Sequence, residues 1–75
     1  MSTMIKLPEF QDEVKHKTAD MTGVVIAKYP RPNMTVPGNP QLWALDIRRA
    51  DEVIEYNSPA ENWEIVRTAY ERGQV

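Results

Sequence analysis

The chain has 75 residues, no cysteine, one histidine and only three glycines. Without cysteine, neither a disulfide framework nor a thiolate metal site can stabilise the fold. The single histidine, His16, would complete a zinc site only with carboxylates or other subunits, so we expect no metal and no cofactor. A chain of this length forms one domain near the lower size limit for independent folding. Association with a partner or with itself would therefore add stability.

The sequence also lacks a strong excess of charge and any long apolar run. Its net charge of -2 differs from the basic excess of dedicated nucleic-acid or membrane binders. No apolar run approaches membrane-spanning length, and residues 1–8 lack the apolar core of a signal peptide. We therefore expect a cytoplasmic protein without membrane association. There is no paired nucleophile and base, no phosphate-binding glycine loop and no dinucleotide motif, which favours a non-enzymatic role.

What the sequence does contain is a series of short stretches typical of strands. Residues 13–17 alternate between charged side chains and Val14 and His16, and residues 23–29 are rich in β-branched side chains. Residues 41–48 place Trp43 and every second residue after it on one face. Residues 52–56 return as a hairpin partner after a turn at 49–51. These patterns predict a mainly β domain.

A proline-rich segment separates the second and third predicted strands. Between Pro30 and Pro40 there are four prolines, one glycine and two asparagines, which predicts one long, stiffened loop without helix or sheet. Long loops in small domains often carry function. The alternative is a structural lid that packs over the end of the domain through Met34 and Val36.

The last third of the chain has two interpretations. Ser58 to Glu61 reads as a capping box, and Gly73 stands where a helix C-cap would be. This predicts a helix at 59–72 lying over an antiparallel sheet, an α+β fold. Residues 62–66 also alternate as a closing strand with Trp63 inward. Propensity alone favours the helix.

The order of elements resembles that of SH3-like small barrels, and more distantly type II, plasmid-encoded dihydrofolate reductase. The similar segments are Val14 to Lys17, Gly23 to Val25 followed by Tyr29, and Val53 to Tyr56. The resemblance implies a closing strand at Trp63 to Val66 rather than the helix. With this strand, we predict a barrel of about five antiparallel strands at 10–66 and a short helical C-terminal extension at 67–75. Pro8 discourages helix and strand pairing before the barrel, so we expect a flexible arm at 1–9.

The residues that would form the active site of such a reductase do not match. In that family a Val-Gln-Ile-Tyr strand of each subunit lines the pore of a tetramer, where folate and nicotinamide cofactor bind. Here Val53 and Tyr56 match the first and last positions, but Ile54 replaces the glutamine and Glu55 replaces the isoleucine. The chain thereby loses a hydrogen-bonding amide and gains negative charge facing anionic ligands. A pore-type oxidoreductase remains an alternative, but fold resemblance alone does not transfer function.

Aromatic side chains give the main functional prediction. Tyr29 borders the proline-rich segment, and Tyr56 leads into the predicted turn at Ser58. Rigid rings bury area at small entropic cost, and peptide-binding modules use them. We predict a protein-binding or self-associating module whose contact surface is the loop 30–40 with the residues Tyr29, Arg31, Met34 and Tyr56.

Other side chains allow further alternatives. Basic residues near Tyr29 and Trp43 would suit nucleic-acid binding of the small-barrel type, as a second alternative function. Trp43 and Trp63 fit the core better, and His16 fits the barrel wall better than a catalytic base. Asp46 and Glu55 lie in predicted strands and would face each other across the hairpin, but solvated outer-face charges explain them more simply than a catalytic pair.

Overall fold

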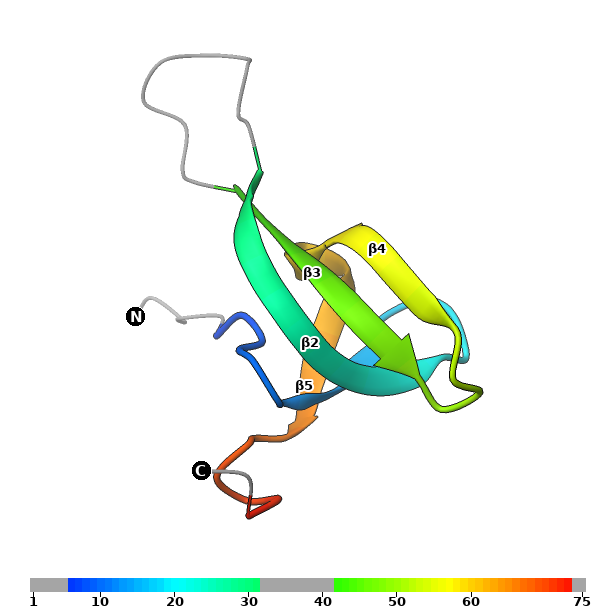
Figure 1. Ribbon diagram of the computed structural model, residues 1–75, viewed down its shortest axis with the longest axis vertical. Helices are drawn as coiled ribbons and strands as arrows, with labels where there is room; N and C mark the ends of the chain where they lie inside the picture. Colours follow the sequence, from blue (N-terminus) through cyan, green and yellow to red (C-terminus); the bar gives the residue numbers. More distant parts are fainter. Residues whose placement is uncertain (1–5, 32–41, 74–75) are drawn as a thin grey trace.

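The computed structural model describes residues 6–31 and 42–73 and shows one antiparallel sheet of five strands (Figure 1). Its strand order is β4-β3-β2-β1-β5. The elements are β1 (Glu13–His16), β2 (Thr22–Arg31), β3 (Leu42–Arg49), β4 (Ile54–Pro59), the 3-10 turn η1 (Ala60–Asn62) and β5 (Trp63–Arg67). The predicted mainly β architecture of about five antiparallel strands is confirmed.

Bulges bend this sheet so that one face can enclose a core. The pairing shifts between Val25 and Ala27 in β2 and between Leu45 and Ile47 in β3. An extra residue on one strand bends it locally and increases its twist. In Figure 1, β2 and β3 accordingly run together as a long curved ribbon, and β5 runs in a different direction. The curvature brings both ends of the sheet around the same interior.

The interior is small and built from nearly every element. Trp63 is its largest member and is 1% exposed, and its indole N–H donates to the Ser58 hydroxyl at 2.8 Å. Each fully buried large apolar side chain contributes about 2 kcal/mol. Trp43 packs against this core while remaining partly exposed, so its predicted core position is only partly correct. The buried cluster comprises Val14, Val25, Leu45, Ile47, Ala60 and Trp63.

One glycine is required because β2 and β3 approach closely. A Cβ atom on Gly23 would lie 2.6 Å from Ile47 Cγ2 and 2.7 Å from the Arg48 carbonyl oxygen. Both distances are below normal contact, and the backbone of β3 cannot move away without breaking the ladder. Any side chain at position 23 would therefore separate the two longest strands.

The proline-rich loop begins later than predicted. Pro30 and Arg31 belong to β2 and pair with Trp43 and Leu42. The prediction failed because proline is excluded only where both sides of a strand are paired. β1 pairs only with residues 22–24 of β2, so β2 is an edge strand at Pro30. The rest of the predicted loop, including Met34, lies outside the described residues.

The predicted closing strand is confirmed as β5, and the alternative helix at 59–72 is wrong. The predicted capping box does not form. Ser58 is buried at the end of β4 and its hydroxyl accepts the indole N–H of Trp63, so it is not free to cap a helix. Glu61 instead pairs with Arg31, at 3.1 Å. Only the three-residue turn η1 follows, and Trp63 is extended. Burial of the indole thus overrides local helix propensity.

A capping box does form further along, at Thr68 and Glu71. The Thr68 N–H donates to Glu71 Oε1 at 2.8 Å, and the Glu71 N–H donates to Thr68 Oγ1 at 3.2 Å. These contacts with Thr68 lower the pKa of Glu71. The Arg72 N–H bonds the Thr68 carbonyl, and Gly73 follows at φ 73°. The predicted helical extension is therefore a single capped turn and not a helix.

The buried carboxylate of Asp12 holds this C-terminal turn against the start of the chain. Asp12 is 2% exposed, and its oxygens accept the N–H groups of Glu9 at 2.9 Å and Ala69 at 2.7 Å. The Arg72 guanidinium donates to the carbonyl of Gln11 beside it. Within the predicted arm, the described residues 6–9 include Pro8, which is buried, and Leu7, which packs against the core.

We expect Asp12→Ala to lower the free energy of unfolding by about 3 kcal/mol, because two N–H groups lose a charged acceptor. Asp12→Asn should cost less, because its amide oxygen still accepts one bond. Chemical denaturation followed by tryptophan fluorescence measures both. Asp20→Asn, at an exposed position, is the control. Equal stability of Asp12→Ala and wild type would contradict this role.

Candidate functional site

The outer face of β2, β3 and β4 carries an apolar surface. Val25 and Ile47 are register partners and both are buried. Because side chains alternate along a strand, their neighbours Val24 and Arg48 point to the opposite face. Arg48 pairs in turn with Ile54 of β4. Val24, Arg48 and Ile54 therefore form one row across three strands on the outside of the sheet.

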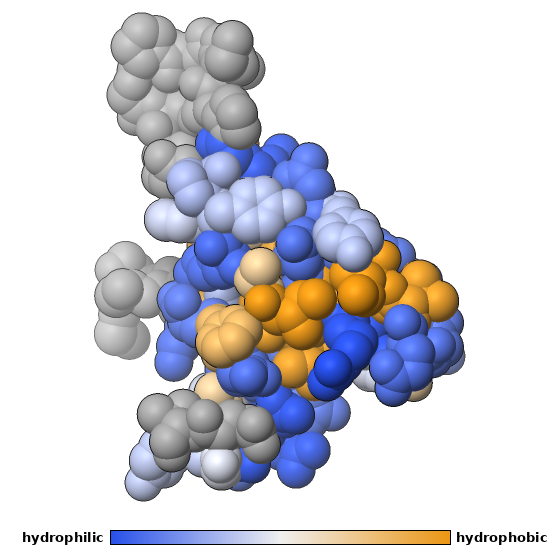
Figure 2. Space-filling model, viewed as in Figure 1, coloured by the Kyte–Doolittle hydropathy of each residue, from blue (hydrophilic) through white to orange (hydrophobic). Residues whose placement is uncertain are grey.

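Exposed apolar side chains extend this row along the edge of the sheet. Val53 is 50% exposed, Ile54 36% and Tyr56 70%. Figure 2 shows hydrophobic side chains gathered over the middle of the face in view and extending to one side. β4 is the terminal strand of the sheet order. We call Val24, Arg48, Glu52, Val53, Ile54 and Tyr56 the outer patch.

Two charges of opposite sign belong to the outer patch. Within residues 6–31 and 42–73, neither Arg48 nor Glu52 forms a side-chain hydrogen bond or an ion pair. Both line an open depression of about 270 Å³ beside Val24. By contrast, Arg49 is bound by Asp51 and Glu55. The outer patch thus offers one cation and one anion beside its apolar side chains.

The structure separates the predicted site residues into different roles. Tyr29 is half-buried, and its hydroxyl donates to Asp46 Oδ1 at 2.8 Å. The same oxygen accepts the N–H of Asn57, at 3.0 Å. The Asp46 carboxylate therefore links Tyr29 to Asn57, which follows Tyr56 in the chain. Arg31 lies at the end of β2, in its ion pair with Glu61.

The hydrogen bond to Asp46 raises the pKa of Tyr29, and desolvation and the negative charge of Asp46 act in the same direction. Asp46 and Glu55, predicted to face each other across the hairpin, have other partners, because Glu55 accepts from Arg49 at 3.3 Å. Asp46 thus acts as an acceptor that orders the sheet surface. The hydrogen bonds of these two carboxylates are made to different residues and not to each other.

His16 has a structural role at the first turn. Its ring meets Trp63 edge-on at 5.0 Å between centroids, and its Nδ1 accepts the N–H groups of Thr18 and Ala19. No group of three or more metal-ligating side chains occurs among the residues that the structure describes. None of those residues forms a helix long and apolar enough to cross a membrane.

Of the outer patch, sequence reasoning identified only Tyr56, because it treated Val53 and Ile54 as part of a hairpin strand and as positions of the reductase motif. One signal was present. Val53 and Ile54 are adjacent and apolar, and in a strand they cannot both face the core. Only the strand order shows that β4 is an edge and that Ile54 points outward.

No family model, no curated protein and no solved structure matches this chain significantly.

We expect Tyr29 to ionise above pH 10, because its hydroxyl proton is held by Asp46. The difference between the ultraviolet pH titrations of wild type and Tyr29→Phe reports tyrosinate formation at this residue. With a raised folded pKa, Tyr29 stabilises the fold below the ordinary tyrosine pKa of 10.0. This contribution is lost as the pH rises through the folded value.

Asp46→Asn should move the Tyr29 titration back toward pH 10, because the amide carries no charge. A Tyr29 midpoint that is the same in wild type and Asp46→Asn would contradict control by this carboxylate.

Proposed function

We propose that this protein is a small non-enzymatic interaction module that associates with a second copy of itself through the outer patch. The main support for this proposal is the exposed apolar edge of the sheet formed by Val53, Ile54 and Tyr56. An uncovered apolar strand at the edge of a sheet invites pairing with another chain. A domain with so small a core also gains stability from association.

The charges of the outer patch support a second copy as the occupant. An isologous contact about a two-fold axis needs a self-complementary surface, with each group facing its complement on the other copy. Arg48 and Glu52 lie on the same patch without partners among the described residues. Packing two outer patches together would bring Arg48 of one copy to Glu52 of the other. A purely acidic partner would satisfy only one of these charges.

Aromatic and aliphatic side chains would supply the binding energy of this contact. Tyr56 is a large ring with little conformational entropy to lose, and such residues dominate interface energetics. Ile54 and Val53 would exclude water around it. The predicted participation of the loop 30–40, including Met34, remains a prediction, because residues 32–41 lie outside the described part of the chain.

We expect Ile54→Lys to raise the dimer dissociation constant about tenfold or more, because it places a charge in the apolar contact. Sedimentation velocity over a range of protein concentrations measures the mass. Val66→Lys is the matched control, because Val66 is 49% exposed on the opposite edge strand, β5. A monomeric wild type at all concentrations would refute the proposal.

A charge-reversal cycle tests the orientation of the two copies. Arg48→Glu and Glu52→Arg should each weaken association, because each creates like-charge pairs. The double variant should restore it, because both pairs are re-formed with opposite sign. The same sedimentation experiment measures all four proteins. A double variant weaker than either single variant would exclude the Arg48–Glu52 pairing.

A further inference from the structure

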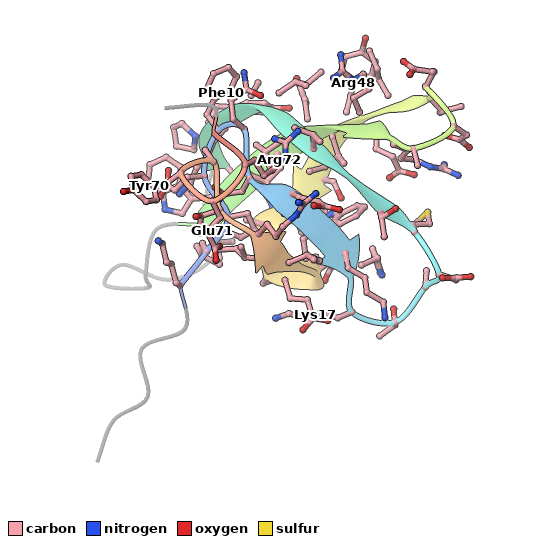
Figure 3. The ribbon with its side chains drawn as sticks, turned by 90° about the horizontal axis from the view of Figure 1, so that it is seen from below. Phe10, Lys17, Arg48, Tyr70, Glu71 and Arg72 are labelled. Carbon is pink, nitrogen blue, oxygen red and sulfur yellow. The ribbon has the colours of Figure 1, made fainter. Side chains whose placement is uncertain are left out.

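A second surface, lined by two aromatic residues, lies along β2 and shares no residue with the outer patch. It is an open depression of about 590 Å³, bordered by Glu9, Phe10, Ala27, Lys28 and Trp43. Phe10 is 56% exposed and projects outward (Figure 3). Small-molecule sites commonly have volumes of about 300 to 1,000 Å³. Ala27 is the smallest of the residues that border this depression.

A lysine brings positive charge to the same depression. The ammonium of Lys28 lies 5.1 Å from the centroid of the Trp43 ring and 2.8 Å from Glu9 Oε1. The Glu9 side chain is 60% exposed, whereas that of Lys28 is only 16% exposed. An exposed carboxylate contributes little to such a pair and exchanges readily. Lys28 is thus a fixed cation whose anionic partner can be replaced.

We propose that this depression binds a nucleobase together with its phosphate. The base would stack on Phe10, beside the Trp43 ring that the Lys28 ammonium covers, since every base offers a flat π-face to aromatic side chains. The phosphate would replace the Glu9 carboxylate as the partner of Lys28. A cationic ligand is disfavoured, because the Lys28 ammonium already occupies the position over the Trp43 ring.

The two tryptophans make this binding observable without a label. Trp63 is 1% exposed, whereas Trp43 borders the depression, so a stacked base should quench the fluorescence of Trp43 alone. The probes are adenosine monophosphate and a short single strand of thymidines. Saturable quenching by the monophosphate would identify free nucleotides as a source, and quenching by the strand alone would identify single-stranded nucleic acid. Quenching by neither probe would overturn the proposal.

Variants distinguish this site from non-specific binding. Phe10→Ala should weaken binding about tenfold, because it removes one stacking surface. The matched control is Val66→Ala, since Val66 is 49% exposed on β5 and belongs neither to the depression nor to the outer patch. Binding that falls equally in both variants would overturn the assignment, as would binding unchanged by Phe10→Ala.

The competition between Glu9 and phosphate gives the sharpest test. Glu9→Gln should tighten binding, because it frees Lys28 and removes a repulsive charge.

Lys28→Gln should weaken binding of the thymidine strand and reduce the slope of log affinity against log salt by about 0.7, the value for one phosphate contact on a single strand. Weaker binding by Glu9→Gln would contradict the proposal. Ile54→Lys should bind like wild type, which separates this site from self-association.

Discussion

The fold depends on how a short chain without disulfides joins its two ends. Asp12 meets this requirement by accepting N–H groups from both Glu9 and Ala69 inside the protein. Its own backbone carbonyl accepts the N–H of Val25, a core residue of β2. One residue therefore connects the beginning of the chain, its C-terminal turn and the longest hairpin. A buried carboxylate is stable only when fully hydrogen-bonded, and here the backbone supplies its donors.

The curvature of the sheet determines which side chains stay exposed and are therefore available for binding. The bulges in the β2–β3 and β3–β4 pairings curve the sheet so that one face encloses a core that includes Val25 and Ile47. The neighbours of these two residues, Val24 and Arg48, point outward. Because β4 is the last strand of the sheet, no described element covers Val53, Ile54 or Tyr56. The same alternation that builds the core thus produces the outer patch.

Sequence patterns identified the strands well and their ends less well. Alternation located β1 and β3, and it also fitted β5, where the resemblance to small barrels and not propensity favoured a strand. The exclusion of proline from strands failed at Pro30, where strand pairing is one-sided, and the capping-box pattern failed at Ser58, whose hydroxyl accepts a hydrogen bond from Trp63. The contact at Ser58 requires Trp63, five residues later, to fold back onto it, and the one-sided pairing at Pro30 depends on the strand order. Most of the outer patch was missed because exposure on an edge strand depends on strand order and not on local sequence.

The hydrogen bonds of Asp12 also position residues of the aromatic depression. Glu9 and Phe10, which border the aromatic depression, lie in the segment that the Asp12 carboxylate and the Gln11 backbone hold against β2. Gln11 has a φ of 73°, so the chain turns sharply between Phe10 and Asp12. This turn lets Asp12 remain inside while Phe10 projects outward. The residue that closes the fold therefore also presents the aromatic ring, so folding and the proposed ligand binding at this surface depend on the same hydrogen bonds.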